Sequence, residues 1–176
     1  SSAKASNKRV WTKAARELVN DSKFLARVSS HPNIVTLRGL TMDAYGTCLV
    51  QGQWKDFFLI QDRVSTTLAD RIAQWRAENA AGLSGALAAD DYSASDCDPN
   101  EDLIPMKCNY AFQIAKALQY LHSQGILYRD LKPLNVGFAL HDPHTVQLLD
   151  FGLARDFPAR SPNSDEFFKM SLAGTR

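Results

Sequence analysis

The chain has 176 residues, of which 45% are hydrophobic and 22% are charged, and this composition is close to the average of globular proteins. Its 20 Lys and Arg residues and 19 Asp and Glu residues give a formal net charge of +1, so charge gives no reason to expect nucleic acid as a partner. No apolar run reaches the ~18 residues that a membrane span requires. The length favours one domain, or one domain with an extension.

Three cysteines, Cys48, Cys97 and Cys108, form no CxxC pair. We interpret them as free thiols of a reducing compartment, which makes a cytoplasmic location the default expectation, with a nuclear one also open. None of the four histidines is paired with a cysteine at zinc spacing, so no structural zinc is predicted.

Residues 12–28 have the apolar spacing of an amphipathic helix. Its apolar stripe consists of Ala14, Leu18, Leu25 and Val28. Asp21 lies on the same stripe, and a carboxylate on an inward face must be hydrated, paired or shifted in pKa. The alternative is a helix that is less buried than the stripe suggests. The basic residues ahead of it fit the start of a surface helix, which we prefer, or a transit peptide.

Three strands are predicted after this helix. Pro32 disfavours helical backbone at the residue before it, and a strand is predicted to begin at Ile34. Further strands are predicted over residues 46–52 and 57–64, where apolar residues dominate.

A second helix is predicted after residue 67, because Thr67 and Asp70 have the spacing of a capping box. Residues 77–105 contain seven acidic residues and no Lys or Arg, with many Ala, Gly and Ser. We interpret this stretch as an acidic surface insert, and an acidic docking site is the alternative.

The clearest predicted helix covers residues 106–124, with Gly125 as its C-terminal stop. Its predicted buried stripe consists of Ala111, Ile114, Ala115, Leu118 and Leu121. A β-hairpin is predicted beyond it, with strands at 136–140 and 145–149 and a four-residue loop between them.

Two acidic residues lie where packing alone gives no reason for them. Asp130 stands in a polar segment between the helix and the hairpin, and Asp150 follows an apolar strand. Lys132 and Asn135 share the segment with Asp130. Such a set suits phosphoryl transfer, which needs oxygen ligands for Mg²⁺, a cation near the phosphate and an acceptor for the nucleophile's proton.

The run YRDLKPLN at 128–135, followed by DFG at 150–152, resembles the serine/threonine type of the eukaryotic protein kinases. HPNIV after the first helix and LAGTR at the end of the chain strengthen the resemblance. It implies an α+β, two-lobe protein-kinase-like fold that is incomplete here. Residues 1–64 would form part of the small β-rich lobe and residues 65–176 the first part of the helical lobe.

The resemblance implies a role for each matched residue. Asp130 would orient the substrate hydroxyl and accept its proton, and Lys132 would lie beside the transferred phosphate. Asn135 and Asp150 would hold Mg²⁺. The adenine of ATP would bind at the hinge and above a residue of the hairpin, at the positions of Asp62, Arg63, Val64 and Gly137.

Other matched positions would be regulatory. Tyr128 replaces the commoner His and would pack in an internal spine with Leu25, Leu37 and Phe151. Arg129 would pair with a phosphorylated activation segment. The remaining regulatory positions are Gly152 of DFG and two hydroxyl residues of the activation segment, Ser171 and Thr175. Asp21, which stands where the family has a glutamate in the first helix, is the last of them.

The sequence also departs from the family pattern. Asp21 replaces a glutamate, Gly137 replaces a larger apolar residue, and neither a Gly-rich phosphate loop nor the usual strand lysine is found. We therefore predict a protein serine/threonine kinase seen as part of a larger domain, with the 176 residues inactive on their own. The alternatives are a pseudokinase scaffold that binds partners without catalysis and, less favoured, a small-molecule or lipid kinase.

Overall fold

A computed structural model describes residues 2–28, 30–41, 57–86 and 103–157. The helices and strands follow one another along the chain as α1 (Ser2–Val28), β1 (Leu37–Leu40), β2 (Leu59–Gln61), β3 (Val64–Thr67), α3 (Leu68–Ala86), α4 (Leu103–Ser123), β4 (Ile126–Leu127), a 3₁₀ turn (Pro133–Asn135), β5 (Val136–Ala139), β6 (Val146–Leu148) and β7 (Arg155–Asp156). The strand predicted at 46–52 lies outside the described residues, as do Cys48, Cys97, Ser171 and Thr175.

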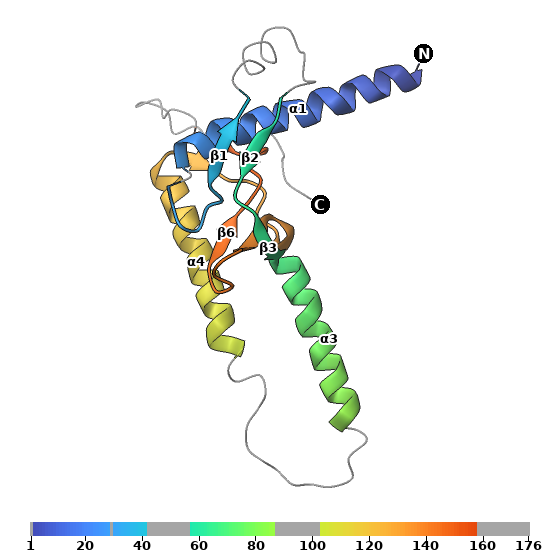
Figure 1. The fold of residues 1–176 in the computed structure, drawn as a ribbon, viewed down its shortest axis with the longest axis vertical. Helices are drawn as coiled ribbons and strands as arrows, with labels where there is room; N and C mark the ends of the chain where they lie inside the picture. The colour runs from blue at the N-terminus through green and yellow to red at the C-terminus, as the bar shows by residue number, and fades with distance from the viewer. Residues whose placement is uncertain (1, 29, 42–56, 87–102, 158–176) are drawn as a thin grey trace, which may run out of the picture.

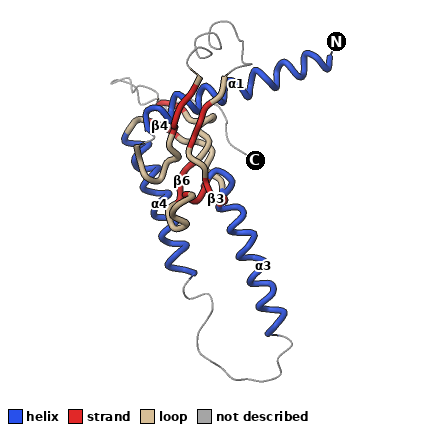
Figure 2. Tube along the Cα trace, viewed as in Figure 1, coloured by secondary structure: helices blue, strands red, loops and turns tan. Residues whose placement is uncertain are grey.

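The strands form three small antiparallel sheets, β1–β2, β3–β5–β6 and β4–β7. Helix α1 crosses one end of the molecule, and α3 and α4 extend away from the other side of the strands (Figure 1). Helices and sheets therefore occupy separate parts of the chain rather than alternating, as the tube in Figure 2 shows. This arrangement confirms the predicted α+β class.

The predicted strand at 57–64 is in fact two strands in different sheets. β2 ends at Gln61 and pairs with β1, whereas β3 begins at Val64 and pairs with β5. The chain changes sheets at Asp62 and Arg63, where both carboxylate oxygens of Asp62 accept hydrogen bonds from Arg38 of β1, at 2.6 and 2.7 Å. The strand predicted to begin at Ile34 is found as β1, which starts at Leu37, whereas Ile34 itself forms only a single bridge with Leu148.

The predicted hairpin is confirmed, with Val136 opposite Leu148 and Phe138 opposite Val146. These four side chains are almost fully buried. They pack in one core with the inner faces of α1 and α4, which contribute Phe24, Leu25, Val28, Tyr110, Ala117 and Leu121. Because burying one large apolar side chain gives about 1.5–3 kcal/mol, this core holds the loops between the elements in fixed positions.

Helix α3 begins with the predicted capping box. The backbone N–H of Thr67 donates to Asp70 Oδ2 at 2.9 Å, and the N–H of Asp70 donates to Thr67 Oγ1 at 3.3 Å. The first residues of the predicted acidic insert, from residue 77, belong to α3, which continues to Ala86. The Ala-rich sequence there has high helix propensity.

Helix α4 starts at Leu103, three residues before the predicted start. Its buried residues are Tyr110, Ala117 and Leu121, whereas Ala111 and Ala115 are exposed, so that part of the predicted stripe is wrong. On the observed buried face, the Tyr110 ring packs edge-on against Phe138, with ring centroids 5.1 Å apart. Gly125 ends the helical segment with φ of 70°, as predicted.

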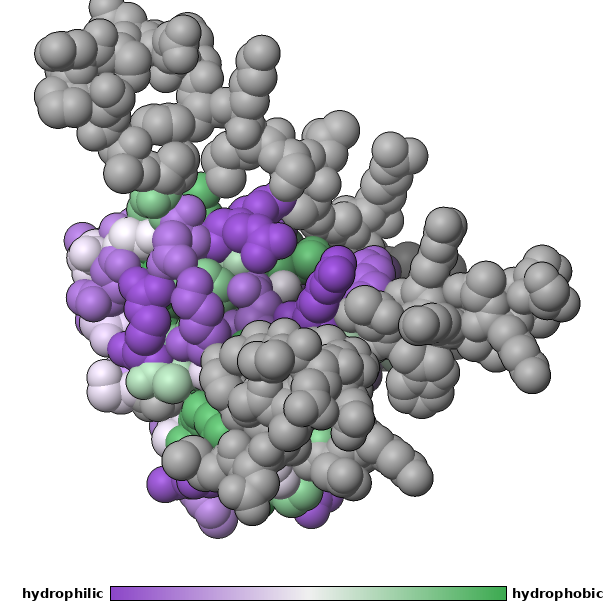
Figure 3. Space-filling model, turned by 90° about the horizontal axis from the view of Figure 1, so that it is seen from above, coloured by the Kyte–Doolittle hydropathy of each residue, from purple (hydrophilic) through white to green (hydrophobic). Residues whose placement is uncertain are grey.

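Several large apolar side chains remain on the surface. Seen from above, the described surface is mostly hydrophilic with separate hydrophobic patches (Figure 3). The most exposed large hydrophobic residues are Phe58, Ile60, Ile104, Phe112, Leu131 and Leu134. No helix among the described residues is both long and apolar enough to cross a membrane.

Gly137 is buried at the closest approach of β3 and β5. A Cβ atom at this position would lie 2.8 Å from Val64 Cγ1 and 3.0 Å from both Val64 Cβ and Leu149 Cδ1. Such distances are shorter than van der Waals contact, and Val64 is β-branched and stiff. The space that a larger residue occupies in the family pattern is therefore filled by Val64 and Leu149.

We predict that Gly137→Ala lowers the free energy of unfolding by about 1–3 kcal/mol, the usual cost of overpacking. Gly39→Ala is the matched control, because no atom lies within 4 Å of a Cβ added at Gly39. Urea unfolding of the full-length protein and both variants checks this. Equal stability of the two variants would contradict the close approach of β3 and β5.

Candidate active site

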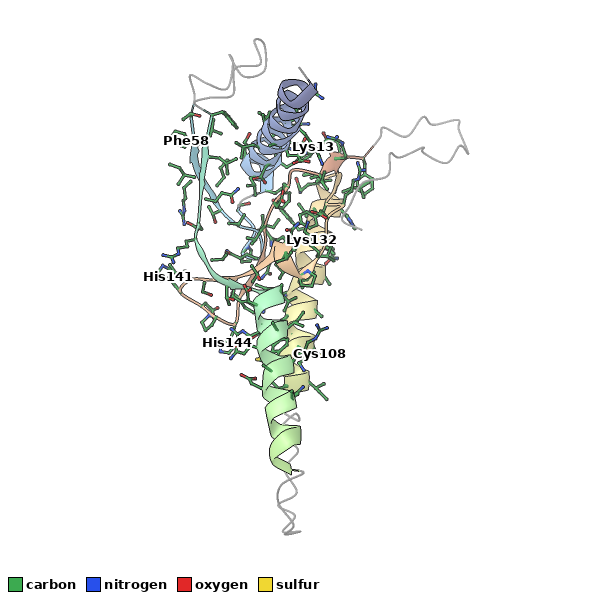
Figure 4. The ribbon with its side chains drawn as sticks, turned by 90° about the vertical axis from the view of Figure 1, so that its right-hand side faces the viewer. Lys13, Phe58, Cys108, Lys132, His141 and His144 are labelled. Atoms are coloured by element: carbon green, nitrogen blue, oxygen red, sulfur yellow. The ribbon has the colours of Figure 1, made fainter. Side chains whose placement is uncertain are left out.

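The polar segment between β4 and β5 folds around the buried carboxylate of Asp130, whose residue is 5% exposed. Lys132 Nζ lies 2.8 Å from Asp130 Oδ2. Asn135 Nδ2 donates to the same oxygen at 2.9 Å and to the Asp130 carbonyl at 3.0 Å. The structure thus brings together the three residues predicted to be catalytic, and Lys132 lies in the middle of the molecule between α1 and α3 (Figure 4).

The local sequence explains this conformation. Arg129 has φ of 72°, a left-handed backbone that turns the chain directly ahead of Asp130. Pro133 starts the 3₁₀ turn, in which the Asn135 N–H donates to the Lys132 carbonyl at 2.9 Å. The Asn135 carbonyl then accepts from the Leu149 N–H at 2.9 Å, which ties the segment to the hairpin.

Asp150 follows β6, also in a left-handed conformation, with φ of 54°. Its Oδ1 accepts a hydrogen bond from the Gly152 N–H at 3.0 Å, and its side chain reaches solvent. The next residue, Phe151, is completely buried. The chain therefore turns sharply so that an exposed carboxylate and a buried ring stand on adjacent residues.

Tyr128 and Phe151 join the two loops. Their rings pack edge-on with centroids 5.1 Å apart, and the Tyr128 hydroxyl donates to the Leu149 carbonyl. Of the two leucines predicted to share a spine with them, Leu25 belongs to the same hydrophobic core and Leu37 packs against it. Burial, followed by the negative charges of Asp150 and Asp130, raises the pKa of Tyr128.

Asp21 lies on the inward face of α1 and is 8% exposed, so the alternative of a less buried helix is wrong. Its Oδ1 accepts from the Phe151 N–H at 2.7 Å, and its Oδ2 accepts from Gln61 Nε2 at 3.0 Å. Within the described ranges it forms no ion pair. Burial raises the pKa of Asp21 to about 6, and the charge of Asp150 adds to this effect, whereas both hydrogen bonds oppose it.

Sequence reasoning missed Asn20. Its Nδ2 lies within 3.1 Å of three backbone carbonyls in the segment after Asp150, those of Phe151, Gly152 and Ala154. Apolar periodicity gives no signal for such a contact, because Asn20 is half-buried at the edge of the stripe. Its position next to Asp21 was the available hint.

The residues predicted to bind adenine lie at the change from β2 to β3. The Asp62 N–H donates to the Thr36 carbonyl at 3.0 Å, Arg63 is exposed, and Val64 packs against Gly137. A cavity of about 320 Å³ beside Asp62 and Arg63 is lined by hairpin residues and contains none of the catalytic-loop residues. That cavity is therefore separate from the site around Asp130.

The donor atoms at this site fit Mg²⁺. Among the described residues, no group of three or more His, Cys, Asp or Glu side chains could hold a metal. Asn135 has an amide oxygen and Asp150 has a carboxylate that could bind the ion. Mg²⁺ commonly binds one or two carboxylates together with water and substrate phosphates. Burial is the main cause of the raised pKa values of Tyr128 and Asp21, and the negative charge of Asp150 raises both further.

Residues 2–176 match the protein kinase domain family. The chain belongs to this family. It is 27% identical over 156 residues to ribosomal protein S6 kinase 2 beta of Xenopus laevis, covering 87% of the chain and 19% of that protein. It is 26% identical over 141 residues to the tyrosine kinase receptor Cad96Ca of Drosophila melanogaster, covering 80% of the chain and 15% of the receptor.

A shorter match has a higher sequence identity. The chain is 41% identical over 66 residues to 3-phosphoinositide-dependent protein kinase 1 of Rattus norvegicus, covering 38% of the chain and 11% of that kinase. The chain thus spans less than a fifth of the length of each of these relatives. The predicted resemblance to protein kinases is confirmed.

The raised pKa of Asp21 gives this kinase domain a testable pH dependence. Because the pKa rises from 3.8 to about 6 on folding, folding favours the protonated carboxyl. Asp21 therefore contributes most to stability below pH 3.8, and this contribution falls as the pH rises through 6. The shift corresponds to about 3 kcal/mol.

We expect Asp21→Asn to remove this loss of stability between about pH 4 and pH 7, measured by urea unfolding across that range. The control is Asp142→Asn, which changes an exposed carboxylate in the hairpin loop. It should show the same change in the free energy of unfolding between pH 4 and pH 7 as the wild type. Identical pH profiles for wild type and Asp21→Asn would show that Asp21 does not titrate abnormally.

Proposed function

We propose that the protein containing this chain transfers the γ-phosphate of ATP to Ser and Thr hydroxyls of protein substrates. The observation that carries the proposal is the buried Asp130 carboxylate, with Lys132 and Asn135 both bound to its Oδ2. This arrangement suits a proton acceptor that is held in one orientation next to a cation. Similarity to ribosomal protein S6 kinases over most of the chain supports it.

In this mechanism Asp130 orients the substrate hydroxyl and accepts its proton as the oxygen attacks the phosphate. General-base assistance of this kind typically contributes about 10²–10⁴-fold to the rate. Lys132 holds Asp130 and lies where its positive charge can stabilise the transferred phosphoryl group. Lys two residues after the Asp resembles Ser/Thr kinases, so hydroxyls of Ser and Thr are the proposed acceptors.

Asn135 and Asp150 are the residues that hold Mg²⁺. When bound, the ion neutralises charge on the phosphates of ATP. Asn135 has its amide nitrogen committed to Asp130, which directs the amide oxygen elsewhere and keeps it suited to a cation. Asp62, Arg63 and Val64 supply backbone groups for adenine, above a floor to which Val64 and Leu149 contribute in place of a side chain at Gly137.

A pseudokinase scaffold is the second candidate. Two observations favour it: Asp21 binds the Phe151 N–H and Gln61 in place of the ion pair usual in the family, and Gly137 lacks the usual apolar side chain. The intact set of Asp130, Lys132, Asn135 and Asp150 favours the enzyme, because a scaffold has no chemical use for it.

The deciding experiment is Asp130→Asn in the full-length protein, assayed for phosphate transfer from ATP to Ser, Thr and Tyr peptides. We expect the rate to fall by about 10²–10⁴-fold, with ATP affinity retained because Asp130 is not assigned to nucleotide binding. Asp142→Asn makes the same chemical change on the hairpin loop and should leave the rate unchanged.

Wild-type protein that binds Mg-ATP and phosphorylates nothing would favour the scaffold. Transfer to Tyr peptides alone would overturn the proposed acceptor class while leaving the role of Asp130 intact.

A further inference from the structure

Three carbonyl groups of the segment after Asp150 converge on one side chain of α1. Asn20 Nδ2 donates to the carbonyls of Phe151, Gly152 and Ala154, at 3.1, 2.9 and 2.9 Å. These residues lie between β6 and β7, where no strand pairing satisfies their carbonyls. Since an amide nitrogen carries only two hydrogens, at least one of them is shared between two acceptors.

The neighbouring residue of α1 binds the same segment with the opposite polarity. Asp21 Oδ1 accepts from the Phe151 N–H at 2.7 Å. Both polar groups of the Phe151 backbone are therefore bound by consecutive residues of one helix. This pair fixes the segment in position and in rotation, because an N–H and a C=O on opposite sides of one residue cannot both stay bonded if the backbone turns.

Gly152 allows the segment to lie directly on the helix. A Cβ atom at this position would meet Glu17 Cβ at 3.1 Å, the Glu17 carbonyl at 3.4 Å and Asp150 Oδ1 at 3.0 Å. The backbone of α1 is thus one wall of the turn that carries the Asp150 carboxylate. Asn20, one helical turn from Glu17 along the helix, binds the carbonyls of this turn.

We propose that Asn20 is a positioning residue for Asp150, because its amide binds the backbone of the turn that carries the Asp150 carboxylate. The importance of Asp150 rests on the proposed function, whereas the contacts of Asn20 do not. A displacement of α1 breaks up to three hydrogen bonds to residues 151–154 and releases the turn that holds Asp150. Because the Asn20 amide is neutral, its contacts with this turn do not depend on any ion pair made by Asp21.

The test uses Asn20→Ala and Asn20→Asp in the full-length protein. The first removes the donor, and the second keeps the shape but places a carboxylate against three carbonyls. Hydrogen exchange is measured at the amides of Phe151, Gly152 and Ala154, each of which is hydrogen-bonded. We expect hydrogen exchange at these amides to be about tenfold faster in Asn20→Ala, and faster still in Asn20→Asp. In both variants, local opening of the segment no longer requires breaking the hydrogen bonds from Asn20 to the three carbonyls.

Lys23→Ala is the matched control. It removes another contact from α1 to the same part of the chain, the Lys23–Asp156 ion pair at 2.9 Å, but leaves the turn bound. Its exchange at 151–154 should equal that of wild type. In addition, the Mg²⁺ concentration for half-maximal phosphate transfer should rise severalfold in the Asn20 variants and not in Lys23→Ala.

Unchanged exchange at 151–154 in Asn20→Ala overturns the proposal, whether or not the protein is an active kinase. Faster exchange that extends equally to the core amides of β6 also overturns it, because Asn20 would then serve overall stability. Faster exchange confined to 151–154 supports it, even in a protein that transfers no phosphate, in which case only the proposed function fails. If Asn20→Asp does not fold, Asn20→Ala alone decides.

Discussion

The edge-on contact between Tyr128 and Phe151 is the interaction on which the site depends. Tyr128 begins the loop that carries Asp130, and Phe151 follows Asp150, so the two rings fix the two carboxylate-bearing loops relative to each other. Both rings are at most 2% exposed, and their burial is part of the same core that holds α1, α4 and the hairpin together. Catalytic geometry here is thus an outcome of hydrophobic packing.

The same packing brings three carboxylates near the Tyr128 hydroxyl. Asp21, Asp130 and Asp150 all act on the Tyr128 hydroxyl, and they differ in how the fold treats them. Lys132 and Asn135 compensate Asp130, two neutral donors hold Asp21, and Asp150 reaches solvent. A carboxylate that is solvent-exposed beside two buried ones is the natural place for a cation, whereas the compensated Asp130 is better suited to proton transfer.

The sequence predicted elements and motifs better than faces and boundaries. The capping box, the Gly125 stop and the hairpin depend on local residue chemistry, so they could be found without tertiary contacts. The buried face of α4 could not, because it depends on tertiary contacts such as that between Tyr110 and Phe138. Likewise the hydrogen bonds between Arg38 and Asp62 at the change of sheets join residues 24 positions apart. The site residues were predictable as a motif, but the Asn20 contacts join residues more than 130 positions apart.

The left-handed backbones of Arg129 and Asp150 have a further consequence. Neither residue is Gly, and each such conformation costs roughly 1–3 kcal/mol that the surrounding structure must supply. Both loops of the site therefore contain an unfavourable backbone conformation. The packing of Tyr128 against Phe151 and the hydrogen bonds from α1 to residues 151–154 stabilise these conformations. Loss of that core packing releases both strained turns together, so the site is lost as a unit and not one residue at a time.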